Sequence, residues 1–193
     1  YDSQMYTIDT VKPTIAISAP TKVKKDNITN TTIVVTDAIE IQPSGIEIDP
    51  SSAGMAQGLV CTPDSGDKNI INCTVTITES GDLTIKATDK AGNNTIRSED
   101  NYVIDRIAPV VSIANTAPIN KANRAHYALS GACTFGDGDI VVVVAGQSHV
   151  AECLNDGTWS TVLDLSLRPD GMVAVYVSQT DAVGNKGENT KEL

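Results

Sequence analysis

The chain has 193 residues, of which 40% are hydrophobic and only 4% aromatic, and it carries a formal net charge of −10. This length allows one or two domains of ordinary size, with cores built from small aliphatic side chains. The negative charge argues against nucleic acid or an anionic membrane as a partner. No apolar run approaches the roughly 20 residues needed to span a bilayer, so membrane insertion is not expected.

Short runs rich in β-branched residues, separated by Gly, Asn, Asp and Pro, predict strands, and no helical apolar period persists for three turns. In the first half the expected strands are residues 13–18, 31–36, 45–48, 59–62, 70–78, 83–88 and 95–104. In the second half they are residues 109–113, 125–134, 140–145, 148–154, 158–165, 172–180 and the segment from 188 onward. Residues 51–58 are small and are expected to be flexible. About seven short strands in roughly 90 residues is typical of an immunoglobulin-like sandwich.

Two unrelated motifs each occur twice. The pattern Y-x-I-D-x-h-x-P, in which h is apolar, begins at Tyr6 and at Tyr102, which are 102 − 6 = 96 residues apart. The pattern T-D-x-x-G-N begins at Thr88 and again at Thr180, 180 − 88 = 92 residues later. Repetition at nearly one period indicates tandem homologous domains. We therefore expect repeats at residues 10–104 and 105–193, with residues 1–9 as the tail of a preceding repeat in a longer array.

Four cysteines are divided equally between the halves: Cys61 and Cys73 in the first, Cys133 and Cys153 in the second. Four cysteines allow three pairings, and pairing within each half fits the repeat best. No C-x-x-C and no Cys/His metal spacing is present. We expect two disulfides formed in an oxidising compartment, each closing a short loop, with reduced buried thiols as the alternative.

The repeating unit resembles the bacterial immunoglobulin-like repeats of large cell-surface adhesins. The matching residues are Tyr102, Ile104, Asp105, Pro109, Asp156, Gly157, Thr158, Trp159, Thr180, Asp181, Gly184 and Asn185. The first half matches at its ends but lacks the D-G-T-W turn. The resemblance implies an all-β fold of two tandem immunoglobulin-like β-sandwiches, end to end. It also implies a monomer at the bacterial cell surface, with neighbouring repeats of the same chain as partners and, in some members, calcium at the junctions.

In such a sandwich the N-terminus, the B–C loop and the F–G loop share one pole, and acidic residues fall at that pole in both halves. They are Asp9, Asp37 and Asp89 in the first, and Asp105, Asp137, Asp139 and Asp181 in the second. Converging carboxylates repel one another, and Ca²⁺, which takes about six to eight oxygen ligands, removes that repulsion. The amide oxygens of Asn93 and Asn185 are further candidate ligands. The alternative is that each Asp bonds to its own turn.

No catalytic constellation is present. The sequence contains no G-x-S-x-G, no H-E-x-x-H and no Gly-rich phosphate loop, and His126 and His149 have no acid or nucleophile at motif spacing. Trp159 is expected in the core rather than as a sugar-stacking residue. The sequence therefore predicts a protein that is not an enzyme.

The leading interpretation is a stalk or spacer repeat that holds a distal binding domain away from the cell. Pro13 and Pro109 begin strands and stiffen the linkers, and no Gly/Ser spacer separates the halves, which favours a semi-rigid rod. A host surface ligand would then be bound elsewhere in the parent protein. The alternative is an adhesive module that contacts a host protein or glycan through the irregular region from Ser51 to Asn69.

Overall fold

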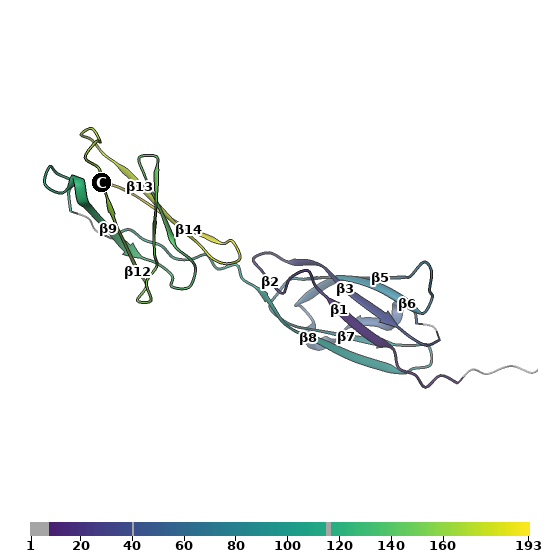
Figure 1. The fold of residues 1–193 in the computed structure, drawn as a ribbon. Coiled ribbons are helices and arrows are strands. Elements are labelled where there is room, and N and C mark those ends of the chain that lie inside the picture. The colour runs from purple at the N-terminus through teal and green to yellow at the C-terminus, as the bar shows by residue number, and fades with distance from the viewer. Residues whose placement is uncertain (1–7, 40, 115–116) are drawn as a thin grey trace, which may run out of the picture. The chain divides into compact units, whose positions relative to one another are not determined.

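A computed structural model describes residues 8–39, 41–114 and 117–193. The chain divides into two compact units, Tyr1–Asp105 and Arg106–Leu193 (Figure 1). The described residues form strands and three short 3-10 helices, with no α-helix among them, so no described helix is long and apolar enough to cross a membrane. The expected tail at residues 1–9 and the motif residue Tyr6 lie outside the described residues, except for positions 8 and 9.

Unit 1 contains two sheets that enclose one apolar core. Its elements are β1 (Thr14–Ser18), β2 (Val23–Lys24), β3 (Ile28–Thr36), η1 (Pro43–Gly45), β4 (Ile46–Ile48), η2 (Pro50–Ser52), β5 (Ala56–Pro63), β6 (Ile70–Ile77), β7 (Gly81–Thr88) and β8 (Asn94–Ile104). One sheet has the order β1-β3-β6-β5 and the other β2-β8-β7-β4. With β2 set aside, and the rest lettered A to G, these are the A-B-E-D and G-F-C groupings of an immunoglobulin constant-type sandwich.

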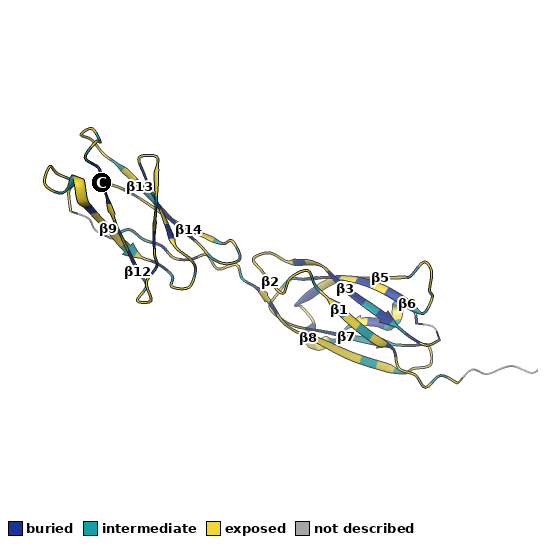
Figure 2. Cartoon of the chain, viewed as in Figure 1, coloured by how far each residue is buried: buried dark blue, intermediate teal, exposed yellow. Residues whose placement is uncertain are grey.

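The core of unit 1 follows from alternation along its strands. On β3, Ile33 and Val35 are buried while their neighbours Thr32 and Val34 are more exposed, because successive side chains of a strand point to opposite faces (Figure 2). The opposite sheet contributes Ile85 among others to the same cluster. Each such side chain contributes roughly 1.5–3 kcal/mol when fully buried.

The region expected to be flexible, residues 51–58, is instead part of this sandwich. Met55 and Ala56 are buried in the core, and β5 begins at Ala56. The Ser52 hydroxyl donates to the carbonyl oxygen of Asp82 (2.7 Å) and accepts from the backbone N–H of Thr84 (2.8 Å). The small residues therefore permit close packing against β7 rather than mobility. Cys61 and Cys73 face each other across β5 and β6 and form a disulfide.

Unit 2 has the same layered plan with one strand moved. Its elements are η3 (Arg124–His126), β9 (Tyr127–Ala132), β10 (Ile140–Val144), β11 (Gln147–Ala151), β12 (Thr158–Leu163), β13 (Ala174–Thr180) and β14 (Lys186–Glu192). The sheets have the orders β11-β10-β13-β14 and β12-β9. In unit 1 the strand before the E position, β5, pairs with β6, whereas in unit 2 β11 pairs with β10 in the other sheet.

The segment expected as a strand at residues 109–113 lies along β9 without being a regular strand. The backbone N–H groups of Ser112 and Ala114 donate to the carbonyl oxygens of Ala132 (3.0 Å) and Ser130 (2.8 Å). A Cβ placed on Gly131 would lie 1.8 Å from the carbonyl oxygen of Ser112. Glycine is therefore what allows the segment to approach this closely.

Unit 2 also contains a disulfide, Cys133–Cys153, which joins the end of β9 to the segment after β11 and so links the two sheets. The only tryptophan, Trp159, is 1% exposed, and its indole N–H donates to the carbonyl oxygen of Ser112 (3.0 Å). Burial confirms that Trp159 is a core residue. Both cysteine pairs are those that pairing within each half predicts.

Candidate metal centre

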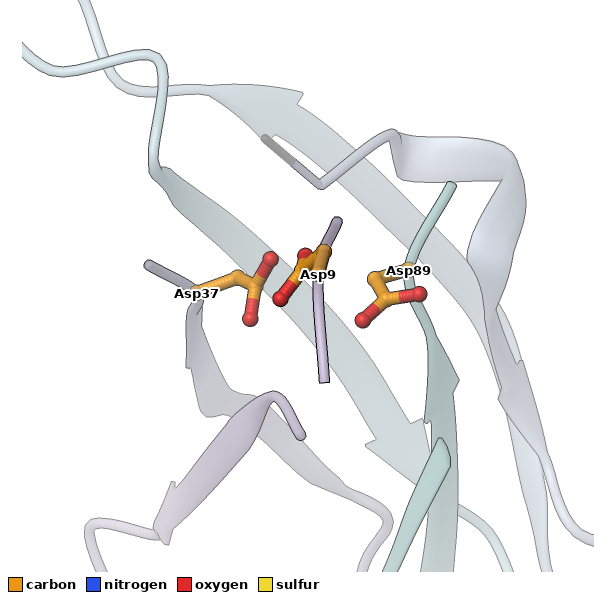
Figure 3. A group of neighbouring side chains, drawn as sticks. All are labelled: Asp9, Asp37 and Asp89. Carbon is orange, nitrogen blue, oxygen red and sulfur yellow. The ribbon is translucent and has the colours of Figure 1, made fainter. Parts of the chain in front are cut away.

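Three carboxylates from distant parts of the chain converge at one pole of unit 1. Asp9 lies on the extended segment before β1, Asp37 follows β3, and Asp89 follows β7. One oxygen of each lies within 4.8 Å of the others, and Figure 3 shows the three carboxylates gathered together. Among the residues that the structure describes, this is the one group of three or more His, Cys, Asp or Glu side chains with such geometry.

Asp37 is the most constrained member of the group. It is 9% exposed, and both of its carboxylate oxygens are buried without a hydrogen-bond partner. Its backbone N–H donates to the carbonyl oxygen of Asn69 (3.0 Å), which fixes the loop but leaves the side chain unsatisfied. A buried carboxylate without a donor or counter-charge is costly, so this arrangement calls for a positive partner.

Asp89 is held in its turn by Asn93. The backbone N–H of Asn93 donates to Asp89 Oδ1 (2.9 Å) and its side-chain amide donates to Oδ2 (2.8 Å). Burial raises the pKa of Asp89, but these hydrogen bonds, first from the side chain and then from the backbone of Asn93, lower it by more, so the pKa lies below its usual value. Asp89 is therefore a carboxylate at neutral pH.

Asn93 also connects this turn to the segment that carries Asp9. Its side-chain amide donates to the backbone carbonyl oxygen of Asp9 (3.3 Å), and Asp9 Oδ1 accepts from the backbone N–H of Val11 (3.0 Å). The nitrogen of Asn93, rather than its oxygen, thus faces the cluster. Asn93 positions two of the three aspartates instead of serving as the additional oxygen ligand that the sequence suggested.

The donor set fits a hard divalent cation. Oxygens that bind one Ca²⁺ at about 2.3–2.6 Å are at most about 5 Å apart, which matches the 4.8 Å limit that encloses the three ligand atoms. Three carboxylates supply part of a shell of six to eight oxygens, and carbonyl groups or water complete such shells. No nitrogen or sulfur ligand is in the group, which disfavours zinc.

Sequence reasoning missed Asn69 as a neighbour of this site. Its backbone carbonyl accepts from Asp37, and its side-chain Oδ1 is a further buried oxygen without a hydrogen-bond partner. Asn69 lies in the turn before β6, and no motif ties that turn to Asp37. The sequence carries no signal for this contact because it arises from the meeting of two loops.

The acidic residues of the second repeat are arranged differently. Unit 2 contains Asp137, Asp139 and Asp181, which are not gathered into a group of three. The fourth, Asp105, is the last residue of unit 1. Asp181 repeats the Asp89 turn, since Asn185 donates from its backbone (2.8 Å) and its side chain (2.8 Å) to the two carboxylate oxygens. Calcium at the Asp105 junction stays a prediction.

In unit 2 a neutral side chain bonds to the loop after β9. Gln179, 1% exposed, accepts from the backbone N–H of Thr134 (3.0 Å) and donates to the carbonyl oxygens of Thr134 (2.7 Å) and Gly138 (2.9 Å). The T-D-x-x-G-N motif aligns Gln179 with Ala87, which has no polar group. The loop after β9 is thus satisfied by an amide, whereas the loop after β3 contains Asp37.

No protein-family model and no curated protein matches the sequence. Solved structures with a similar fold include the fibronectin(III)-like modules of Clostridium thermocellum CbhA, with 13% identity, a TM-score of 0.41, and coverage of 93% of this chain and 92% of that one. Another belongs to a 1.5-MDa bacterial ice-binding adhesin, with 18% identity, a TM-score of 0.49, and coverage of 94% and 63%. A third is bovine butyrophilin, with 9% identity, a TM-score of 0.37, and coverage of 96% and 99%. These values are too low to carry a conclusion on family or function.

Proposed function

We propose that the chain is a non-enzymatic structural spacer of a bacterial surface adhesin. In this proposal two tandem immunoglobulin-like repeats hold a distal binding domain away from the cell, and calcium fixes the chain segment that leads into unit 1. The observation that carries the proposal is the buried, unpartnered Asp37 carboxylate beside Asp9 and Asp89. The two disulfides fit an oxidising, extracellular location.

The cation acts as a cross-link between three segments. Asp9 belongs to the lead-in segment, whereas Asp37 and Asp89 belong to loops that close the sandwich. One ion bound to all three replaces carboxylate repulsion with shared attraction, and it fixes the direction in which the chain meets β1. A spacer gains stiffness from such a clamp because the lead-in segment loses its freedom to swing.

The test is Asp37→Asn, which keeps the side-chain shape and removes one negative charge. Without a divalent cation, we expect Asp37→Asn to unfold at a higher temperature than the natural chain, because one of three converging charges is gone. With calcium the order of the two melting temperatures reverses, because calcium at 100 times its Kd stabilises the natural chain by about 2.7 kcal/mol but does not stabilise Asp37→Asn. Calorimetric melting with calcium and with chelator measures both effects.

The matched control is Asp26→Asn, which removes the same charge from an exposed position of unit 1. This variant is expected to respond to calcium as the natural chain does. If calcium leaves the melting temperature of the natural chain unchanged, or raises that of Asp37→Asn equally, the proposal that calcium links the three segments is wrong.

A further inference from the structure

Half of the basic residues of unit 2 line a single hollow. Unit 2 has six Lys and Arg residues, and three of them, Lys121, Arg124 and Arg168, border a hollow of about 670 Å³ between loop 118–124 and loop 165–173. Asp170 is the one acidic side chain in the lining, so the side chains that line the hollow carry a formal charge of 3 − 1 = +2. This positive site lies in a chain whose net charge is −10.

The two arginines are fixed by neutral groups. Arg124 donates from Nη2 to the carbonyl oxygens of Ser166 and Arg168 (2.8 Å to the latter), and its Nε is buried without a partner. Arg168 donates from Nη2 to the carbonyl oxygen of Ala145 (3.1 Å). In the described part of the chain, no ion pair involves Lys121, Arg124 or Arg168. Hydrogen bonds to carbonyl oxygens therefore orient the two arginines, and no carboxylate of the described residues forms an ion pair with any of the three basic side chains.

Asp164, which directly precedes loop 165–173, is hydrogen-bonded within its own turn. Asp164 Oδ1 accepts from the hydroxyl (2.5 Å) and the backbone N–H (2.9 Å) of Ser166. These bonds are the main reason that its pKa is lowered, with smaller contributions from His126 and Arg124. Asp164 is therefore a carboxylate whose hydrogen bonds go to Ser166 rather than to Arg124.

An apolar hollow of about 530 Å³ adjoins the basic one. The two share residues 168–171 and Val173, and the second is also bordered by Val143, Met172 and Tyr176. Met172 is 75% exposed, and the nearby Leu167 is 97% exposed. The segment from Arg168 to Val173 thus has a cationic hollow on one side and an apolar hollow on the other.

We propose that this pair of hollows binds an acidic peptide in which a carboxylate residue alternates with aliphatic residues. Arg168 takes the carboxylate through the N–H groups that its bond to Ala145 leaves open, because a guanidinium matches a carboxylate bidentately. Arg124 adds its positive charge and its Nη1 group, since its Nη2 donates to two carbonyl oxygens and its Nε is buried, and Lys121 adds a third positive charge. An aliphatic side chain of the peptide fills the space beside Met172 and Val143. The one aromatic ring in the two linings, Tyr176, borders the apolar hollow and not the basic one, so an acidic sugar held at the arginines would have no ring to stack on, which favours a peptide.

The experiment titrates the whole 193-residue chain with the peptide acetyl-Leu-Glu-Leu-Glu-Leu-amide and follows backbone amide shifts by NMR. We expect shifts confined to residues 118–124, 143–146 and 165–176, and an affinity that weakens as salt is raised. Arg168→Gln and Lys121→Gln should each weaken binding by about tenfold. The peptide acetyl-Leu-Gln-Leu-Gln-Leu-amide, which has the same shape without charge, should bind at least tenfold more weakly.

Arg97→Gln, on β8 of unit 1, is the matched control and should leave the affinity unchanged. Arg168→Lys tests the bidentate contact, since it keeps the positive charge and should weaken binding if guanidinium geometry matters. Equal binding of the charged and neutral peptides overturns the proposal, as do shifts located elsewhere or full affinity in both Arg168→Gln and Lys121→Gln. A chain that binds oligogalacturonate but not the acidic peptide also overturns it, in favour of an acidic saccharide.

Discussion

At the pole where the D-x-x-G-N turn lies, each unit has a buried polar side chain at the loop after β3 or β9. In unit 2 this side chain is Gln179, whose oxygen and nitrogen both have hydrogen-bond partners. In unit 1 it is Asp37, and neither oxygen has a partner. A neutral amide completes its site without help, whereas a buried carboxylate needs a positive charge. The two units therefore differ in their expected response to cations, although the adjacent turns are alike.

The turns themselves give a prediction on acid stability. Burial raises the pKa of Asp181, but hydrogen bonds from the side chain and backbone of Asn185 and from the backbone of Val183 and Gly184 together lower it by more, so the folded pKa is below the usual value. A depressed folded pKa contributes stability above the unfolded pKa of about 3.9, and this is lost as pH falls through the folded value. We expect Asn185→Ala to move acid unfolding of unit 2 to higher pH and to lower its melting temperature by about 4–8 °C.

Trp159 fluorescence measured against pH and temperature follows this change, because the only tryptophan is in unit 2. The control is Asn189→Ala, which alters an exposed side chain on β14. An acid midpoint that is the same in Asn185→Ala and Asn189→Ala would show that the side-chain bond of Asn185 contributes nothing to acid stability.

At the scale of elements, close approach of backbones determines how the first segment of unit 2 is placed. The segment at 109–114 passes next to Gly131 on β9 and Gly187 on β14, where an added Cβ would lie 1.8 Å from the carbonyl oxygens of Ser112 and Pro109. The backbones of two regular paired strands do not come this close, and residues 109–114 do not form a regular strand. Glycine at these two points lets one segment lie against both sheets.

Gly131→Ala is therefore expected to destabilise unit 2 by about 3 kcal/mol, near the upper end of the usual cost of overpacking. The new methyl group would also lie 2.7 Å from Trp159 Nε1, so the indole must shift. Denaturant unfolding followed by Trp159 fluorescence measures the loss. Ser130→Ala should be nearly neutral, because it changes an exposed side chain on the same strand of unit 2. Equal stability of the two variants would contradict the close-packing argument.

At the scale of the whole molecule, each unit has its own core, its own disulfide and its own turn motif. The carboxylate cluster belongs to unit 1, whereas Trp159 and the basic hollow belong to unit 2. Ligands of the two candidate sites should therefore act on different units, and the units can be followed separately in one experiment.

Calorimetry of the whole chain is expected to show two transitions, of which calcium raises only one. The transition detected by Trp159 fluorescence should keep its temperature, because Gln179 already satisfies the corresponding loop of unit 2. A calcium-dependent rise in the Trp159 transition would instead assign calcium ligands to unit 2. A single transition would show that the units unfold together.

The sequence by itself determined features that depend on neighbours along the chain. Short runs rich in β-branched residues predicted β3, β7 and β13, the T-D-x-x-G-N pattern predicted two tight turns, and equal division of the cysteines predicted both disulfide pairs. The prediction that residues 51–58 are flexible was wrong because small residues are equally suited to close packing.

Tertiary structure decided which polar groups meet and which are deprived of water. Repeat alignment grouped seven aspartates, but only the fold shows that Asp37 is buried without a partner while its counterpart loop contacts Gln179. Lys121, Arg124 and Arg168 lie up to 168 − 121 = 47 residues apart, and only the meeting of two loops brings them to one hollow. Local patterns specify backbone geometry, whereas burial and charge convergence depend on contacts between distant segments, which no local pattern encodes.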